Sequence, residues 1–158
     1  MHRFVIGIDP DISKSGVAIW DREMKRWVLW KAFANEDLID EILKICDPSS
    51  ALILLEAGWL NKKSNYRKTA GRRVSEAISR KVGQNQASGQ LLMRMLEKQG
   101  FIVKEIKPLV KGVLKRDGSW TVTGRKFIEE NTGIKSRIND EVRDALFIVL
   151  ISNQRALF

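Results

Sequence analysis

The sequence predicts an α/β domain with a mixed five-stranded sheet and helices on both faces. Apolar runs of strand length come first and in close succession, and strand and helix patterns then alternate to the C-terminus. An early group of adjacent strands followed by this alternation is typical of a mixed sheet covered by helices. The 158 residues contain no internal repeat and no low-complexity tract, so we expect residues 1–158 to form one domain.

Three strands are expected at the start of the chain. Residues 4–8 form an apolar run that ends on Asp9, where Pro10 stops regular pairing. Residues 16–20 and 27–30 are two further apolar runs joined by a polar turn. We therefore expect the first strand to end on an acid.

A helix and the most apolar strand follow. Asn35 is a suitable N-cap for a helix that runs to about Cys46 and carries acids in its first turn. Pro48 breaks the chain before residues 51–55, an unbroken apolar run typical of a strand covered on both faces. This strand ends on Glu56.

The second half of the chain contains three expected helices and one strand. Apolar residues at helical spacing predict a helix over 84–99, ended by Gly100, and residues 101–106 form the fifth strand. A short helix is expected over 123–131, and Asn139 should cap the final helix.

Composition excludes several classes of protein. A single cysteine, Cys46, excludes an internal disulfide and fits a reducing compartment, and with only His2 beside it the chain cannot close a zinc site. The longest apolar stretch, 145–151, is far shorter than the roughly 20 residues that span a bilayer. The N-terminus has no signal-peptide pattern, so we expect a cytoplasmic protein.

The charge indicates a polyanionic partner. The formal net charge is +9, and residues 61–81 contain eight bases and one acid. The bases are Lys62, Lys63, Arg67, Lys68, Arg72, Arg73, Arg80 and Lys81. A solvated loop is one interpretation of this segment, and contact with nucleic-acid phosphates is the interpretation we favour.

Carboxylates occur where a sheet protein does not need them. Asp9 and Glu56 follow buried strands, and ligands of open sheets gather at the carboxyl ends of strands. Glu141 and Asp144 are three residues apart on the final helix and therefore share a face. Such a cluster needs cations to remain ionised, and oxygen ligands favour Mg²⁺ or Mn²⁺ over zinc.

Each acid also has a purely structural interpretation. Asp9 before Pro10 fits an Asx turn, and Glu56 fits a salt bridge to one of the many bases. Asp140 and Glu141 fit the N-terminal end of a helix dipole. The order of the acids along the chain favours the metal-binding interpretation.

The same residues resemble those of RuvC-type Holliday junction resolvases. The segment 6–10 followed by 15–18 resembles the opening hairpin of that family, and Glu56 matches the acid that ends its fourth strand. Residues 84–100 resemble its next long helix, and 144–146 match its closing Asp-Ala-Leu motif. The resemblance extends over nearly the whole chain.

The resemblance implies a ribonuclease H-like fold, a homodimer, and two magnesium ions held by four acids. By matching position these acids are Asp9, Glu56, Glu141 and Asp144. The family usually has Asp or His where this chain has Glu141, so Asp140 remains an alternative fourth ligand.

The resemblance also implies contacts with DNA. Lys111, and less directly Lys126, match basic positions after the fifth strand and would neutralise charge on the phosphate. Trp59 matches an aromatic residue that enters the junction in many members, although packing into the core is the alternative. The basic segment supplies further expected contacts through Lys62, Lys63, Arg67, Lys68, Arg72 and Arg73.

The implied activity is two-metal cleavage of four-way DNA junctions that leaves 5′-phosphate and 3′-hydroxyl ends. A nuclease of the same fold acting on flaps or RNA–DNA hybrids is an alternative, because fold does not determine substrate. A non-catalytic basic DNA-binding module is a second alternative. Four acids in this order argue against it, since they would repel phosphate without a metal.

Overall fold

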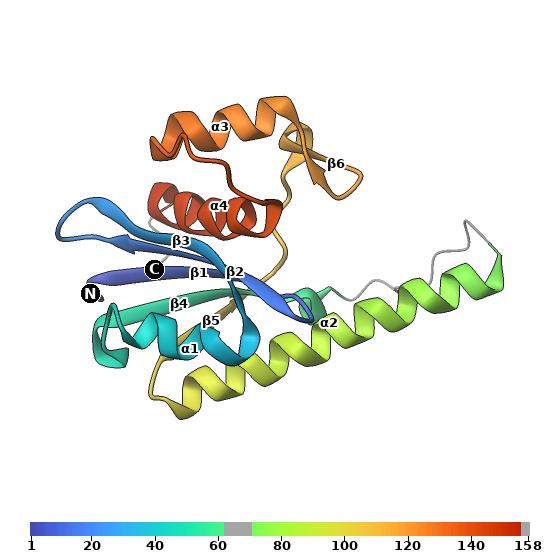
Figure 1. Ribbon diagram of the computed structural model, residues 1–158, viewed down its shortest axis with the longest axis horizontal. Helices are drawn as coiled ribbons and strands as arrows, with labels where there is room; N and C mark the ends of the chain where they lie inside the picture. The colour runs from blue at the N-terminus through green and yellow to red at the C-terminus, as the bar shows by residue number, and fades with distance from the viewer. Residues whose placement is uncertain (62–70, 156–158) are drawn as a thin grey trace.

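The centre of the protein is a five-stranded sheet with strand order β3–β2–β1–β4–β5, in a computed structural model that describes residues 1–61 and 71–155 (Figure 1). The strands are β1 (Phe4–Asp9), β2 (Lys14–Asp21), β3 (Arg26–Ala34), β4 (Ala51–Glu56) and β5 (Ile102–Ile106). β2 pairs antiparallel with β1 and β3, whereas β4 lies parallel to β1 and β5 parallel to β4. The predicted mixed sheet is confirmed.

Helices cover both faces of this sheet, as predicted. One face carries α1 and α2, the other carries α4, and α3 packs outside α4 (Figure 1). The helices are α1 (Asn35–Leu43), α2 (Arg72–Lys98), α3 (Val122–Thr132) and α4 (Asp140–Arg155), with short 3-10 turns η1 (Pro48–Ser50), η2 (Gly58–Leu60) and η3 (Gly112–Leu114). Within the described ranges, no helix is both long and apolar enough to cross a membrane.

The two faces explain why the central strands are continuously apolar. Ile53 and Leu55 of β4 pack toward α1 and α2, whereas Leu52 and Leu54 pack toward α4. Alternate side chains of a strand point to opposite faces, so a strand covered on both sides needs apolar residues at every position. Glu56, two residues after Leu54, therefore belongs to the face of α4.

The helix α2 is longer than the sequence predicted. It begins at Arg72 instead of residue 84 and extends beyond the sheet as an arm (Figure 1). Val74 and Ile78 lie four residues apart in this extension and are both exposed. Charged and polar residues separate the few apolar residues of this segment, so no helical repeat was evident and the segment was interpreted as a basic loop.

A two-stranded hairpin was not predicted. It consists of β6 (Lys115–Arg116) and β7 (Ser119–Trp120). The turn between them is Asp117-Gly118, and both residues have positive φ, 50° and 82°. This is the combination that a two-residue type I′ turn requires, so the Asp-Gly pair was a usable signal.

One predicted helix cap is wrong and one is confirmed. Ala34, not Asn35, precedes α1 as its N-cap. The Asn35 amide instead donates to the carbonyl oxygens of Asp11 (2.8 Å) and Ile12 (3.1 Å), and this ties the loop after β1 to α1. Asn139 caps α4 by accepting the backbone N–H of Val142 at 3.1 Å.

Candidate active site and nucleic-acid interface

Three of the predicted acids converge at one edge of the sheet. Asp9 and Glu56 end the neighbouring parallel strands β1 and β4. Val5 and Leu54 pack toward α4. Asp9 lies four residues after Val5, and Glu56 lies two residues after Leu54. Because alternate side chains of a strand point to the same face, both carboxylates point to the face of α4. Asp144 reaches the same edge from α4 and is buried.

Two glycines allow α4 to approach the sheet closely enough for this convergence. A Cβ on Gly16 of β2 would overlap the carbonyl oxygen of Glu141, and a Cβ on Gly7 of β1 would overlap that of Ala145. The first turns of α4 therefore lie on bare backbone of β1 and β2. Asp9 pairs with Gly16 across the hairpin, so this contact also fixes α4 beside Asp9.

Two lysines lie among the acids. The ammonium nitrogen of Lys111 is 3.4 Å from Oε2 of Glu56 and 3.1 Å from Oδ1 of Asp144. Lys115, on β6, donates to Oδ2 of Asp144 at 2.7 Å. The side chains of Glu56, Lys111 and Asp144 are only 15%, 8% and 5% exposed. These are buried ion pairs, where removing one partner is costly.

Burial and the neighbouring charges shift the pKa values of the acids and of Lys111. Burial raises the pKa of Asp9 well above its usual range, and the negative charges of Asp144 and Glu56 raise it further. Burial also raises the pKa of Glu56, which the charge of Lys111 partly offsets. For Lys111, burial lowers the pKa, but the charges of Glu56 and Asp144 outweigh it and raise the pKa overall.

The two candidates for a fourth acid differ in their partners. Asp140 accepts the guanidinium of Arg143 at 2.7 Å and the backbone N–H of Trp120 at 3.3 Å. The side chain of Glu141 makes no hydrogen bond or ion pair with the described part of the chain. It lines a cavity of about 330 Å³ together with Asp9 and other residues.

Cavities adjoin the acids on both sides of Asp9. The cavity that contains Glu141 is also lined by Asp144 and Lys115. A second cavity, of about 250 Å³, is lined by Asp9, Glu56 and Trp59 among others. Asp9 therefore lines both cavities.

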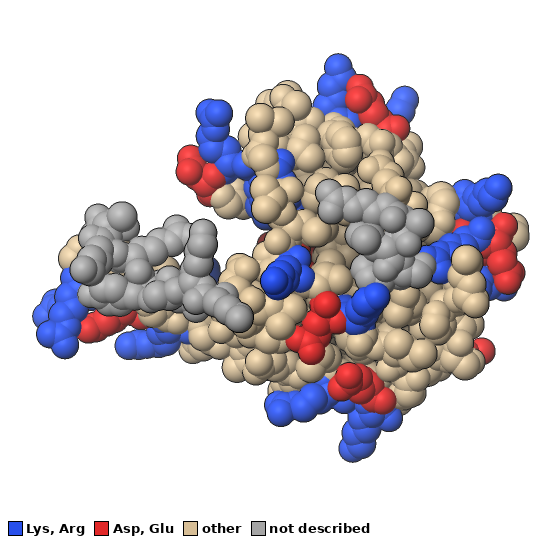
Figure 2. Space-filling view, turned by 180° about the vertical axis from the view of Figure 1, so that it is seen from behind, with Lys and Arg blue, Asp and Glu red and all other residues tan. Residues whose placement is uncertain are grey.

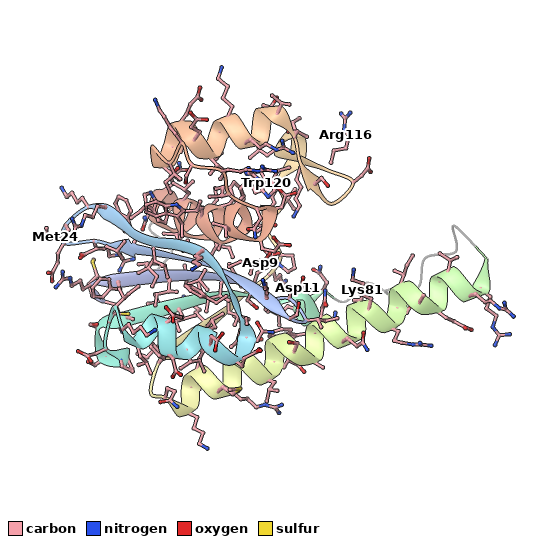
Figure 3. The ribbon with its side chains drawn as sticks, in the orientation of Figure 1. Asp9, Asp11, Met24, Lys81, Arg116 and Trp120 are labelled. Atoms are coloured by element: carbon pink, nitrogen blue, oxygen red, sulfur yellow. The ribbon has the colours of Figure 1, made fainter. Side chains whose placement is uncertain are left out.

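Asn85 of α2 lines both cavities. Its side-chain oxygen is buried and accepts no hydrogen bond within the ranges 1–61 and 71–155. Figure 3 shows Asp9 between the two flanks of this region, with Lys81 on the α2 flank and Arg116 on the hairpin flank. Sequence reasoning did not single out Asn85 or Lys115, because their positions beside the acids depend on how α2 and the β6–β7 hairpin pack in three dimensions.

Trp59 is half-buried, which lies between the two interpretations of this residue, an aromatic that enters the junction and a core residue. Its ring packs against the core, and a Cβ on Gly89 would lie 2.8 Å from its Cζ3. Its indole N–H donates to Oε2 of Glu105 at 2.6 Å. The ring is therefore partly packed into the core and also lines the cavity beside Asp9 and Glu56.

The remaining predicted DNA contacts are spread over three places. Lys62, Lys63, Arg67 and Lys68 lie outside the described residues. Arg72 and Arg73 begin α2 and are exposed, with Arg72 paired to Glu76 at 2.9 Å. Lys126 is not among the acids: its side chain is 74% exposed on α3 and lies 3.8 Å from Glu130.

Lys111 and Lys115 lie among the acids, and further basic side chains lie around them. Figure 2 shows Lys and Arg on the arm formed by α2 and beside the hollow between this arm and the layer of α3 and α4. Lys81 lines the cavity that contains Asp9 and Asp144. The site therefore combines buried acids with basic side chains at its edge.

As they stand, no three acid, histidine or cysteine side chains in the described ranges are grouped so that they could hold a metal ion. The Lys111 ammonium lies between Glu56 and Asp144 and supplies positive charge there. Oδ1 of Asp144 is buried and makes no hydrogen bond of good geometry with described residues. All the metal ligands that these acids could provide are carboxylate oxygens, which magnesium and manganese prefer.

No protein-family model matches the chain, and no curated protein sequence matches it. Its structure, however, resembles that of RuvC from Thermus thermophilus in complex with a Holliday junction substrate. The identity is 16%, the TM-score is 0.60, and the match covers 99% of this chain and 96% of that chain. A second structure of Thermus thermophilus RuvC matches at 18% identity and a TM-score of 0.57, covering 98% and 95% of the two chains. The chain therefore has a RuvC-like form of the ribonuclease H-like fold.

Proposed function

We propose that the protein is a structure-specific endonuclease that cleaves four-way DNA junctions. The observation that carries this proposal is the convergence of Asp9, Glu56 and Asp144 with Lys111 and Lys115, beside cavities with basic side chains at their edge. One of the structures with a matching fold is RuvC in complex with a Holliday junction substrate, which supports the same class of substrate here.

The four acids are the ligands that we propose for a pair of magnesium ions. Asp9, Glu56, Glu141 and Asp144 would hold them through oxygen ligands, and Mn²⁺ would substitute. Magnesium pairs in such sites activate a water molecule and stabilise the leaving 3′ oxygen, which gives 5′-phosphate and 3′-hydroxyl ends.

The chain's own groups would hold the substrate in place. Lys115 and Lys111 neutralise carboxylate charge in the free protein, and each ammonium can instead pair with the scissile phosphate. The buried oxygen of Asn85 can accept a hydrogen bond that the described chain does not supply, for example from a base amino group or a bound water. Lys81 would contact the strand at the cavity edge.

A symmetric junction with two cuts suits a homodimer, and exposed apolar side chains on α2 support this proposal. Val74, Ile78, Leu91 and Met95 of α2 are all at least 37% exposed. Apolar side chains repeated along a protruding helix favour burial against a second copy across a two-fold axis. Sedimentation equilibrium should show a dimer for wild type. The double variant Ile78→Glu, Leu91→Glu should be a monomer in the same measurement.

The direct test uses labelled four-way junction, flap, RNA–DNA hybrid and linear duplex with magnesium, in wild type and in Asp9→Asn. We expect junction cleavage by wild type, loss of cleavage in Asp9→Asn, and junction binding retained in both. Ligation of the products checks their end groups.

The alternatives give different outcomes in the same assay. Preferred cleavage of the hybrid or the flap would identify another nuclease of this fold. Junction binding without cleavage of any substrate, with magnesium or manganese, would identify a non-catalytic DNA-binding protein.

A further inference from the structure

One cavity of the protein lies away from the acids. It has a volume of about 520 Å³ and lies between the hairpin of β2 and β3 and the segment that follows α3. None of its lining residues lines the two cavities beside Asp9. Figure 3 places Met24, at the tip of that hairpin, and Lys81, beside the acids, toward opposite ends of the view.

Three of the five tryptophans line this cavity, and they are held in place by packing. Trp20 and Trp27 meet edge to face, with ring centroids 5.1 Å apart and planes at 68°. Trp27 and Trp30 also pack against the core under α4, and the indole N–H of Trp30 donates to Oγ of Ser136 at 3.4 Å. All three rings are half-buried, so each keeps accessible surface beside the cavity.

Three cations line the same cavity, and no acid does. Lys25, Arg26 and Lys135 are exposed and make no ion pair with residues 1–61 or 71–155. Lys25 adopts a φ of 48°, an uncommon conformation for a lysine, at the turn of the hairpin. Because no acid lines the cavity and its three cations have no ion-pair partner among the described residues, it keeps unneutralised positive charge.

We propose that this cavity is a second nucleic-acid site that binds an unpaired DNA strand. Indole faces beside free cations are the combination that single strands use, because bases stack on aromatic rings while phosphates pair with Lys and Arg. The volume lies in the range of about 300–1,000 Å³ that takes a nucleotide-sized unit. A paired duplex cannot present its base faces to the rings, so the site selects unpaired strands. The site does not depend on the chain being a nuclease.

The test uses an oligothymidylate of about eight nucleotides carrying 5-iododeoxyuridine, bound to the full chain in EDTA so that no cleavage intervenes. Ultraviolet cross-linking followed by peptide mass spectrometry locates the bound bases. Affinity is measured by anisotropy over a range of salt concentrations. The variant is the triple substitution Lys25→Ala, Arg26→Ala and Lys135→Ala. Its control is Lys44→Ala, Arg94→Ala and Lys98→Ala, which makes the same charge change on the opposite face of the sheet.

We expect cross-links to peptides that contain Trp20, Trp27 or Trp30. The cavity variant should bind about fivefold more weakly or worse, with a salt slope smaller by about 2, while the control should bind like wild type. The proposal is overturned if cross-links fall only outside these peptides, or if the two triple variants weaken binding equally. It is also overturned if polyglutamate, and not the oligonucleotide, binds in a way that depends on the three cations, since the site would then recognise an acidic protein. Junction cleavage measured separately on the same variants shows whether the proposed nuclease function holds.

Discussion

The backbone of Gly16 in β2 lies in contact with the carbonyl oxygen of Glu141 in α4, with no space for a Cβ between them. This contact sets the height of α4 above the sheet. Because Asp144 follows Glu141 by one helical turn, the same contact positions Asp144 beside Asp9. A glycine in a strand is thus part of how the acids are assembled.

Gly16→Ala should therefore damage both stability and activity. The added methyl group must push α4 away from β2, and overpacking of this kind costs about 1–3 kcal/mol in the free energy of unfolding. Urea unfolding and junction cleavage measure the two effects. Gly83→Ala is the matched control: Gly83 is in the interior of α2 with nothing within 4 Å of its Cβ position, so this variant should gain about 0.5–1 kcal/mol. Wild-type stability in Gly16→Ala would contradict the contact.

The central sheet was predictable because its central strands are clear apolar runs. The strands that end on Asp9 and Glu56 are buried on both faces, so their continuous apolar character is unmistakable in the sequence. Their parallel pairing brings the strand ends together, which is why two of the acids were found from sequence. Lys111 was found by matching position, and the structure places it among these acids.

The parts that were missed depend on contacts between distant segments. Two-residue strands such as β6 and β7 show no periodicity, so Lys115 could not be placed beside Asp144 without the hairpin. Lys126 was named, less directly than Lys111, because it matches a basic position of the RuvC-type family. The burial of Trp59 depends on Gly89 of α2 and Glu105 of β5, and neither neighbour is visible in the local sequence around Trp59.

Asp9→Asn should stabilise the metal-free protein at neutral pH. Burial and the charges of Asp144 and Glu56 raise the pKa of Asp9, so the folded state holds this proton more tightly than the unfolded state. Below the unfolded pKa, near 3.8, the carboxyl is protonated in both states and the two proteins should be equally stable. As pH rises through the folded pKa, wild type loses stability relative to the variant.

Urea unfolding in EDTA between about pH 4 and pH 8 measures this difference. Magnesium at neutral pH should then stabilise wild type more than Asp9→Asn, because only wild type has the full ligand set. A constant gap across the pH range would contradict the role of the Asp9 charge.

Glu141→Gln and Asp140→Asn should separate the two candidate ligands. Asp140 is already paired with Arg143 and the backbone of Trp120, so Asp140→Asn should lower stability by about 1 kcal/mol or less and retain cleavage. Glu141 has no partner in the described chain, so Glu141→Gln should leave stability unchanged and abolish magnesium-dependent cleavage. The reverse pattern would assign the fourth ligand to Asp140.

Lys115→Met should slow cleavage much more than Lys126→Met. Lys115 lies 2.7 Å from Asp144, whereas Lys126 is exposed on α3 with Glu130 as its ion-pair partner in the described chain. Loss of a charged group beside the reacting phosphate typically costs about a hundredfold or more in turnover. Single-turnover cleavage of a prebound junction measures this step apart from binding. Similar losses in both variants would show that Lys126 also reaches the DNA.

Trp59 offers a test of whether junction preference comes from an aromatic wedge. Its ring packs on α2 at Gly89 and its indole N–H is bonded to Glu105, so we expect its main role to be structural. Trp59→Ala should lower the free energy of unfolding by about 2–4 kcal/mol, because a large, partly buried ring is removed. Trp59→Phe keeps a ring and loses only the N–H, so the loss should be about 1 kcal/mol.

Both Trp59 variants should keep the ratio of junction affinity to duplex affinity under conditions where they are folded. Circular dichroism melts establish the folded range, and competition binding between labelled junction and linear duplex measures the ratio. Glu105→Gln keeps an acceptor for the indole and serves as the control for the loss of charge at this position. A Trp59→Ala variant with wild-type stability and no junction preference would show that the indole acts on the DNA itself.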